Sequence, residues 1–144
     1  WAATCWVNWI RLNLDSIEAI SELPRVESLM KRALELDEGF YYGGPHLFMG
    51  IWFASRPKIV GGDLKKAQEH FLKALDLGQG KFLMAYVYYA NYYARKITDK
   101  DLFTSTLQKV LETPAETSPD LVLLNTVAKK QAKELLSHVG EYFE

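Results

Sequence analysis

Histidine and acidic side chains are the first residues of this chain that could do chemistry. The three histidines, His46, His70 and His138, show no H-E-x-x-H or other metal-ligand spacing, so the sequence predicts no metal site. Glu69 beside His70 could act as acid and base, but neighbours in a helix point about 100° apart. We therefore expect no catalysis and no cofactor, and we interpret His70 as part of an ordinary amphipathic surface.

The run Gly61-Gly62-Asp63 has the composition of a phosphate-binding loop. It lacks the G-x-x-x-x-G-K-[ST] arrangement, however, and it follows no predicted strand. A turn followed by a helix cap at Asp63 explains these residues.

Cys5 is the single cysteine and cannot form a disulfide within the chain. Its neighbours Trp6 and Trp9 predict an apolar setting, in which a free cysteine packs as a small hydrophobic side chain. A lipidated cysteine would head the mature chain, whereas Cys5 lies inside a helical pattern, so we reject that role.

An aromatic segment at residues 81–95 is the feature that most suggests a binding surface. On a helix, its aromatic side chains fall on two sides, of which one should be core and the other should expose tyrosines suited to an interface or ligand groove. Tyrosines packed between repeats would give the same pattern. The candidate ligand- or partner-binding residues are Trp52, Phe82, Tyr86, Tyr88, Tyr89, Tyr92 and Tyr93.

Length and composition predict one all-helical domain over residues 1–144. The hydrophobic content is 49%, and the formal net charge of −1 favours neither nucleic acid nor an anionic membrane surface. No apolar stretch is long enough to span a bilayer, and no signal segment is evident. Because the chain begins at Trp1, we expect a fragment that lacks an N-terminal signal or anchor.

Three- and four-residue spacing of apolar side chains predicts a series of helices and no strand. The expected elements are a helix at 24–37, a short helix at 45–54 that restarts at Pro45 after a break at Gly43 and Gly44, a helix capped by Asp63 and closed by Gly78 and Gly80, the aromatic helix at 81–95, a helix capped by Asp99 and ended by Pro114, and a closing helix at 119–138.

The helix pairs resemble one another in the manner of tetratricopeptide repeats. In that pattern the small residues let neighbouring helices approach, the aromatic residues fill the space beside them, and each hairpin is covered by the next. The predicted fold is therefore a set of tetratricopeptide-like hairpins with a C-terminal closing helix. The repeat-packing residues are Gly50, Phe53, Ala67, Phe71, Ala74 and Ala90.

Most of the chain also resembles the T-component (TatT) family of tripartite ATP-independent periplasmic (TRAP) transporters. The matching residues are Leu23-Pro24-Arg25-Val26, Ala33-Leu34-Glu35-Leu36, Gly44-Pro45-His46-Leu47, Gly61-Gly62-Asp63 with Lys66-Ala67 and His70-Phe71, the stretch from Ala90 to Ala94, Asp101-Leu102-Phe103, and Leu124-Asn125-Thr126-Val127-Ala128.

This resemblance implies a membrane-anchored periplasmic lipoprotein, assembled as a homo-oligomer with three copies expected. It implies docking to the transporter's substrate-binding subunit, and an apolar cavity or pore through which a hydrophobic small molecule passes. The chain departs from the family in lacking a leading signal and a lipidated cysteine. Two other functions compete with this one: a cytoplasmic tetratricopeptide adaptor that holds a peptide in its concave groove, and an enzyme, for which the sequence offers no obvious pair of ionisable groups.

Overall fold

The computed structural model describes residues 1–144, and its regular elements are all helical, which confirms the all-helical part of the predicted fold. No helix is both long enough and apolar enough to cross a membrane. The elements are α1 (Ala2–Arg11), α2 (Ile17–Ser21), α3 (Leu23–Leu36), α4 (Phe40–Ser55), the 3₁₀ turn η1 (Lys58–Val60), α5 (Leu64–Gly78), α6 (Leu83–Tyr88), the π-helical η2 (Tyr89–Ala94), α7 (Lys100–Glu112), the 3₁₀ turns η3 (Ala115–Thr117) and η4 (Pro119–Leu121), α8 (Val122–Ser137) and α9 (Val139–Tyr142).

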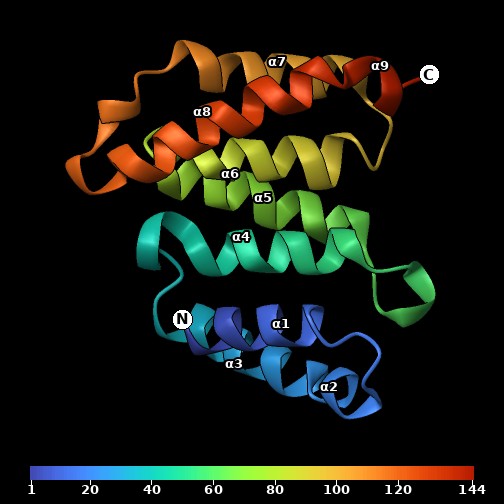
Figure 1. The fold of residues 1–144 in the computed structure, drawn as a ribbon. Helices are drawn as coiled ribbons and strands as arrows, with labels where there is room; N and C mark the ends of the chain where they lie inside the picture. The colour runs from blue at the N-terminus through green and yellow to red at the C-terminus, as the bar shows by residue number, and fades with distance from the viewer.

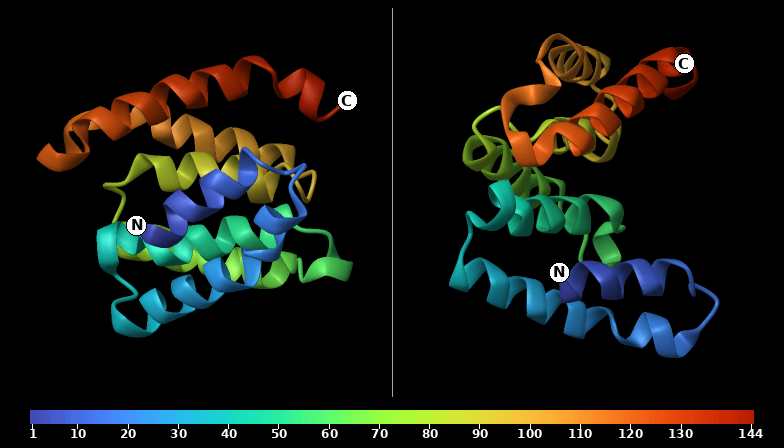
Figure 2. Two further views of the ribbon diagram at one scale, coloured as in Figure 1. Left: turned by 60° about the horizontal axis from the view of Figure 1, so that its bottom comes forward. Right: turned by 60° about the vertical axis from the view of Figure 1, so that its left-hand side comes forward.

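The helices stack in chain order from α1–α3 at one end to α7–α9 at the other (Figure 1). Helix α1 packs on α3, α4 packs on α5, and α6 with η2 packs on α7. Helix α8 then covers both α6 and α7. The right-hand view in Figure 2 shows the same order, with the N-terminus at the α1–α3 end and the C-terminus at the α8–α9 end.

Two hydrophobic clusters hold the stack together, and α4 contributes to both. The N-terminal cluster has six buried residues and joins α1 and α3 to Met49 and Trp52 of α4. The main cluster has twenty buried residues and runs from Leu47 and Ala54 of α4 to α8. The N-terminal helices are therefore attached to the body through one face of α4.

Side-chain caps start α5 and α7 where the sequence predicted them. The Asp63 carboxylate accepts hydrogen bonds from the backbone N–H groups of Lys65 and Lys66, and Asp99 accepts one from Leu102. Both predicted caps are confirmed, because a cap depends only on residues that are close in the chain.

The junction between α3 and α4 contains three successive residues in left-handed conformation, Tyr41, Tyr42 and Gly43, with φ of 48°, 58° and 79°. Each tyrosine adopts this conformation at a cost of about 1–2 kcal/mol. Tertiary contacts hold the turn: Trp1 packs edge-on against Tyr41 with ring centroids 5.0 Å apart, and the Tyr42 hydroxyl donates to the Asp120 carboxylate at 2.9 Å. The predicted break at Gly43 and Gly44 therefore begins two residues earlier.

Two other predicted helices differ from the observed elements. The aromatic helix is α-helical only to Tyr88 and continues as the π-helical η2, in which the Arg95 N–H donates to the Ala90 carbonyl at 3.0 Å. The closing helix begins with the 3₁₀ turn η4, and α8 starts at Val122. Neither α2 nor α9 was predicted.

Asn125 of α8 is fully buried and ties three segments together. Its Oδ1 accepts the Leu83 N–H at 3.0 Å, so it satisfies a donor at the start of α6. Its two Nδ2–H groups donate to the carbonyls of Lys81 at 2.8 Å and Ala115 at 3.1 Å, and Nδ2 also lies 3.0 Å from the Thr117 hydroxyl oxygen, which itself donates to the Lys81 carbonyl. One side chain thus fixes the start of the aromatic helix against α8.

The predicted apolar setting of Cys5 is wrong, because the Cys5 side chain is exposed. Helix α1 turns Ala3 and Ile10 into the N-terminal cluster, whereas Cys5 and Trp9 lie on its opposite side. The tryptophans beside Cys5 suggested that this side of α1 is buried, but the buried side of α1 carries Ala3 and Ile10.

Candidate functional site

The predicted binding residues occupy several different environments. Trp52 is buried in the N-terminal cluster, where it stacks on Phe48 and lies under the Arg56 guanidinium at 3.6 Å from the ring centroid. Burial lowers the pKa of Arg56, and nearby Glu27 opposes that shift. Trp52 therefore does not extend the surface of the aromatic helix.

Three residues of the aromatic segment, Phe82, Tyr89 and Tyr93, are buried in the main cluster. Tyr89 and Tyr93 stack with ring centroids 5.3 Å apart and planes within 6° of parallel. Burial raises the pKa of both hydroxyls, as expected for phenols in an apolar setting. These side chains hold the helix in place.

The remaining tyrosines are half-buried and lie on two different sides. Tyr86 lies beneath the ammonium group of Lys109 of α7, 4.7 Å from its ring centroid. Tyr88 and Tyr92 pack edge to face, with centroids 5.9 Å apart. Burial raises the pKa of Tyr88, Tyr92 adds to the shift, and Arg11 of α1 opposes it. Of the two sides of the aromatic helix, the one predicted to be exposed carries Tyr88 and Tyr92. These two side chains remain partly accessible and lie beside Arg11.

Five of the six repeat-packing residues lie on α4 and α5, and Ala90 lies on η2. A methyl group added at Gly50 would lie 3.0 Å from the Phe71 ring, which is closer than ordinary van der Waals contact, so the ring packs directly against the glycine. Ala67, Ala74 and Ala90 are fully buried. Phe53 is less buried and stacks on His70, with centroids 5.7 Å apart.

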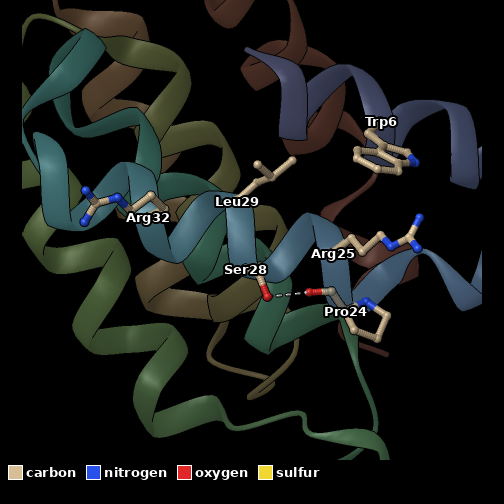
Figure 3. A pocket seen from close by; sticks show the side chains of 6 residues that line it. All are labelled: Trp6, Pro24, Arg25, Ser28, Leu29 and Arg32. Atoms are coloured by element: carbon tan, nitrogen blue, oxygen red, sulfur yellow. Dashed lines mark hydrogen bonds between the residues drawn. The ribbon is translucent and has the colours of Figure 1, made fainter.

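A groove of about 480 Å³ lies between α1 and α3 (Figure 3). Trp6 of α1 and Leu29 of α3 form its apolar part, and Pro24, Arg25, Ser28 and Arg32 complete its lining. The Ser28 hydroxyl donates to the Pro24 carbonyl at 3.0 Å. Arg25 pairs with Glu22, and Arg32 pairs with Glu35.

Exposed apolar side chains are frequent in the same N-terminal part of the chain. More than half of the large apolar residues exposed on the molecule belong to residues 1–40. On α1 and just after it, Trp9 is 49% exposed and Leu12 is 78% exposed. We call Trp1, Trp9, Leu12, Leu29 and the groove the N-terminal face. The sequence analysis missed it, although Trp9 and Leu12 stand three residues apart, as expected for one side of a helix.

His46 and His70 form a pair that the sequence analysis also missed. The two Nδ1 atoms are 2.8 Å apart, within hydrogen-bond distance, and His46 Nε2 lies 3.1 Å from a carboxylate oxygen of Glu38. The second oxygen of Glu38 lies 3.4 Å from the Lys73 ammonium. His70 is half-buried against Phe53, so its interpretation as ordinary surface is wrong.

A second open groove lies at the other end of the molecule. Its lining includes Lys129, Lys130 and Lys133 of α8 together with Glu116. Neither groove contains a candidate aromatic residue, His46 or His70. No group of three or more histidine, cysteine or acidic side chains is arranged to hold a metal ion.

Comparisons with known proteins agree with the resemblance seen in the sequence. A family model described as TRAP transporter T-component matches residues 1–143, nearly the whole chain. A search among curated proteins finds no match.

Proposed function

Since the chain belongs to the TRAP transporter T-component family, we propose that it is a non-catalytic periplasmic scaffold that binds the transporter's substrate-binding subunit. The family match covers residues 1–143 and is the observation that carries this proposal. In this proposal the mature protein is a lipoprotein anchored through a segment that precedes Trp1, and it assembles as a homotrimer. The helices present surfaces to partners and make or break no bonds.

We also propose that the helices form tetratricopeptide-like repeats. Support comes from the order of packing, in which each of α1–α3, α4–α5 and α6–α7 lies against the next along the stack. The close approach of Gly50 to Phe71 adds support, because small residues beside aromatic ones are the contacts expected within such a hairpin.

The N-terminal face is the proposed docking surface for the substrate-binding subunit. Monomeric proteins rarely expose large contiguous apolar patches, and tryptophan and arginine are enriched among the residues that dominate binding energy. Trp9 and Leu12 supply exposed apolar area, while Arg25 and Arg32 lie at the groove and can meet acidic side chains of the subunit.

Substitution of Trp9 by glutamate tests the docking surface. We expect Trp9→Glu to weaken binding of the purified substrate-binding subunit by at least about tenfold, because loss of a central aromatic side chain typically costs ~2 kcal/mol or more. Isothermal titration calorimetry measures this change. The control is Leu123→Glu on α8, where an equally drastic change at a 75% exposed position should leave the affinity within about twofold of wild type.

Equal affinities for Trp9→Glu, Leu123→Glu and the wild-type chain would contradict docking at the N-terminal face. Such a result would leave the family assignment intact and move the docking surface elsewhere on the molecule.

We further propose that Tyr88 and Tyr92 contact a hydrophobic small molecule. Their rings are half-buried and pair with each other, and a tyrosine offers apolar area together with a hydroxyl that can face water. Other candidate residues, such as Tyr89 and Tyr93, hold these rings in place from the core.

The double substitution Tyr88→Ser, Tyr92→Ser is expected to leave the chain folded and to remove the bound molecule. Native mass spectrometry of protein purified from its own organism reports the bound mass and the number of copies per assembly. Tyr86→Ser is the matched control, since Tyr86 lies under Lys109 on a different side, and it should retain the ligand. Complete loss of folding in the double variant would contradict a surface role for the pair.

A further inference from the structure

The histidine pair lies at the junction between the N-terminal helices and the body. Glu38 precedes the left-handed turn at Tyr41–Gly43 and His46 follows it, so their 3.1 Å contact bridges the turn. His70 and Lys73, both on α5, hold His46 and Glu38 respectively. The junction is therefore fastened to α5 at two points.

The distances define how many protons the pair can hold. With Glu38 ionised, His46 Nε2–H donates to the carboxylate, and one proton lies between the two Nδ1 atoms. An added proton on the pair leaves both hydrogen bonds in place, because one Nδ1 still donates and the other still accepts. A second added proton would place N–H groups on both Nδ1 atoms at 2.8 Å, and the contact must then break.

We propose that Glu38, His46 and His70 form a pH-sensitive link that holds the α3–α4 junction against α5. The link persists with one added proton and breaks when both histidines are charged. Opening frees the strained turn from His70 and loosens the position of the N-terminal face relative to α5. All of these contacts lie within the chain, so the link does not depend on which partner the chain binds.

The charges around the pair decide which histidine is charged last. Glu38 from the junction faces His46, while Glu69, Lys66 and Lys73 lie on α5 beside His70 or Glu38. Burial and the neighbouring His46 lower the pKa of His70 from its ordinary value of 6.5, Lys66 lowers it further, and Glu69 opposes the shift. His70 is therefore the group whose protonation breaks the pair.

The sign of the pH dependence follows from that shift. A histidine with a lowered pKa in the folded chain binds its proton more readily in the unfolded chain. Its contribution to stability is present above pH 6.5 and is lost as the pH falls from 6.5 through the folded-state pKa of His70. Acidification is thus expected to open the junction, and neutral pH closes it.

Nuclear magnetic resonance of histidine-labelled protein tests the proton count directly. The chain has three histidines, and long-range ¹H–¹⁵N spectra report the protonation of each ring nitrogen. We expect His46 Nε2 to keep the proton that it donates to Glu38, and His70 to become charged only below pH 6.5. His138, on the opposite end of the stack, supplies a signal outside the network. A His46 Nε2 without a proton at neutral pH, or a His70 that becomes charged at pH 6.5 or above, would overturn the proposal.

Hydrogen exchange measures the mechanical consequence. In the wild-type chain, the protection factors of amides at residues 38–46 should fall between about pH 7 and about pH 5, because charging both histidines breaks the contact that holds the junction to α5. His70→Asn should abolish this fall, because an amide can donate to or accept from His46 Nδ1 without becoming charged. Asparagine and histidine have similar helix propensities, so α5 should persist.

An equal fall in His70→Asn would show that the pair does not fasten the junction. The titration of the unmodified chain remains decisive even if that variant is unstable.

Discussion

Asn125→Leu is expected to lower the free energy of unfolding by about 2–6 kcal/mol. The substitution removes the acceptor of the Leu83 N–H and the donor to the Ala115 carbonyl, while the Lys81 carbonyl keeps the Thr117 hydroxyl as a donor. Each of the two polar groups left without a partner costs ~1–3 kcal/mol. Leucine has a similar size, so the lost hydrogen bonds dominate over any cavity. Urea denaturation followed by circular dichroism measures the change.

The control for this substitution is Asn8→Leu. Asn8 is exposed on α1, and its side chain donates only to the Thr4 carbonyl within the same helix. We expect a change within about 0.5 kcal/mol, as for most surface positions. Equal stabilities of Asn125→Leu and Asn8→Leu would show that Asn125 does not tie α6 to α8.

Gly43→Ala is expected to lower the free energy of unfolding by about 2–5 kcal/mol. The left-handed φ of 79° costs about 1–2 kcal/mol for a residue with a Cβ. The new methyl group would also lie 3.0 Å from the Ala74 Cα, and overpacking of this kind costs typically ~1–3 kcal/mol. A shift of the urea midpoint at constant slope measures the loss.

Gly80→Ala separates the two contributions to this effect. Gly80 has a comparable φ of 72°, but a methyl group there meets no atom within 4 Å. It should therefore cost only the conformational part, about 1–2 kcal/mol. Identical losses at Gly43 and Gly80 would mean that α4 and α5 can move apart at Gly43 without penalty.

Local signals in the sequence predicted most of the helices and their caps. Pro24 in the first turn of α3, Asp63 before α5 and Asp99 before α7 act on neighbours in the chain, so no knowledge of the tertiary structure is needed. The small residues Ala67 and Ala74, which recur at helical spacing, are fully buried. Helix positions, caps and buried faces could therefore be predicted, because they depend on residues that are close in the chain.

Features that depend on contacts between distant segments could not be predicted in this way. No local preference places Tyr41 and Tyr42 in left-handed conformation, which is imposed by packing against Trp1 and by the hydrogen bond to Asp120. The π-helical bonds of η2 likewise have no spacing pattern of their own. Such backbone departures follow from how neighbouring helices fit together.

The candidate site shows the same division. The aromatic spacing correctly located a tyrosine-rich helix, but it could not distinguish the buried Tyr89 from the half-buried Tyr88, because both lie on aromatic sides. His46 and His70 stand on different helices and meet only through the packing of α4 on α5. Both histidines belong to the residues that resemble the family, which is the one signal that could have drawn attention to them.

The unequal sizes of the two hydrophobic clusters have a consequence for cooperativity. Six buried residues hold α1 and α3 to α4, whereas twenty hold the body, so the N-terminal helices should form a separate cooperative unit with a lower free energy of opening. Transient detachment of that unit would uncover Met49 and Trp52 while α5–α8 remain folded. Molecular chaperones and proteases would then recognise the chain first at α4, well before the body unfolds.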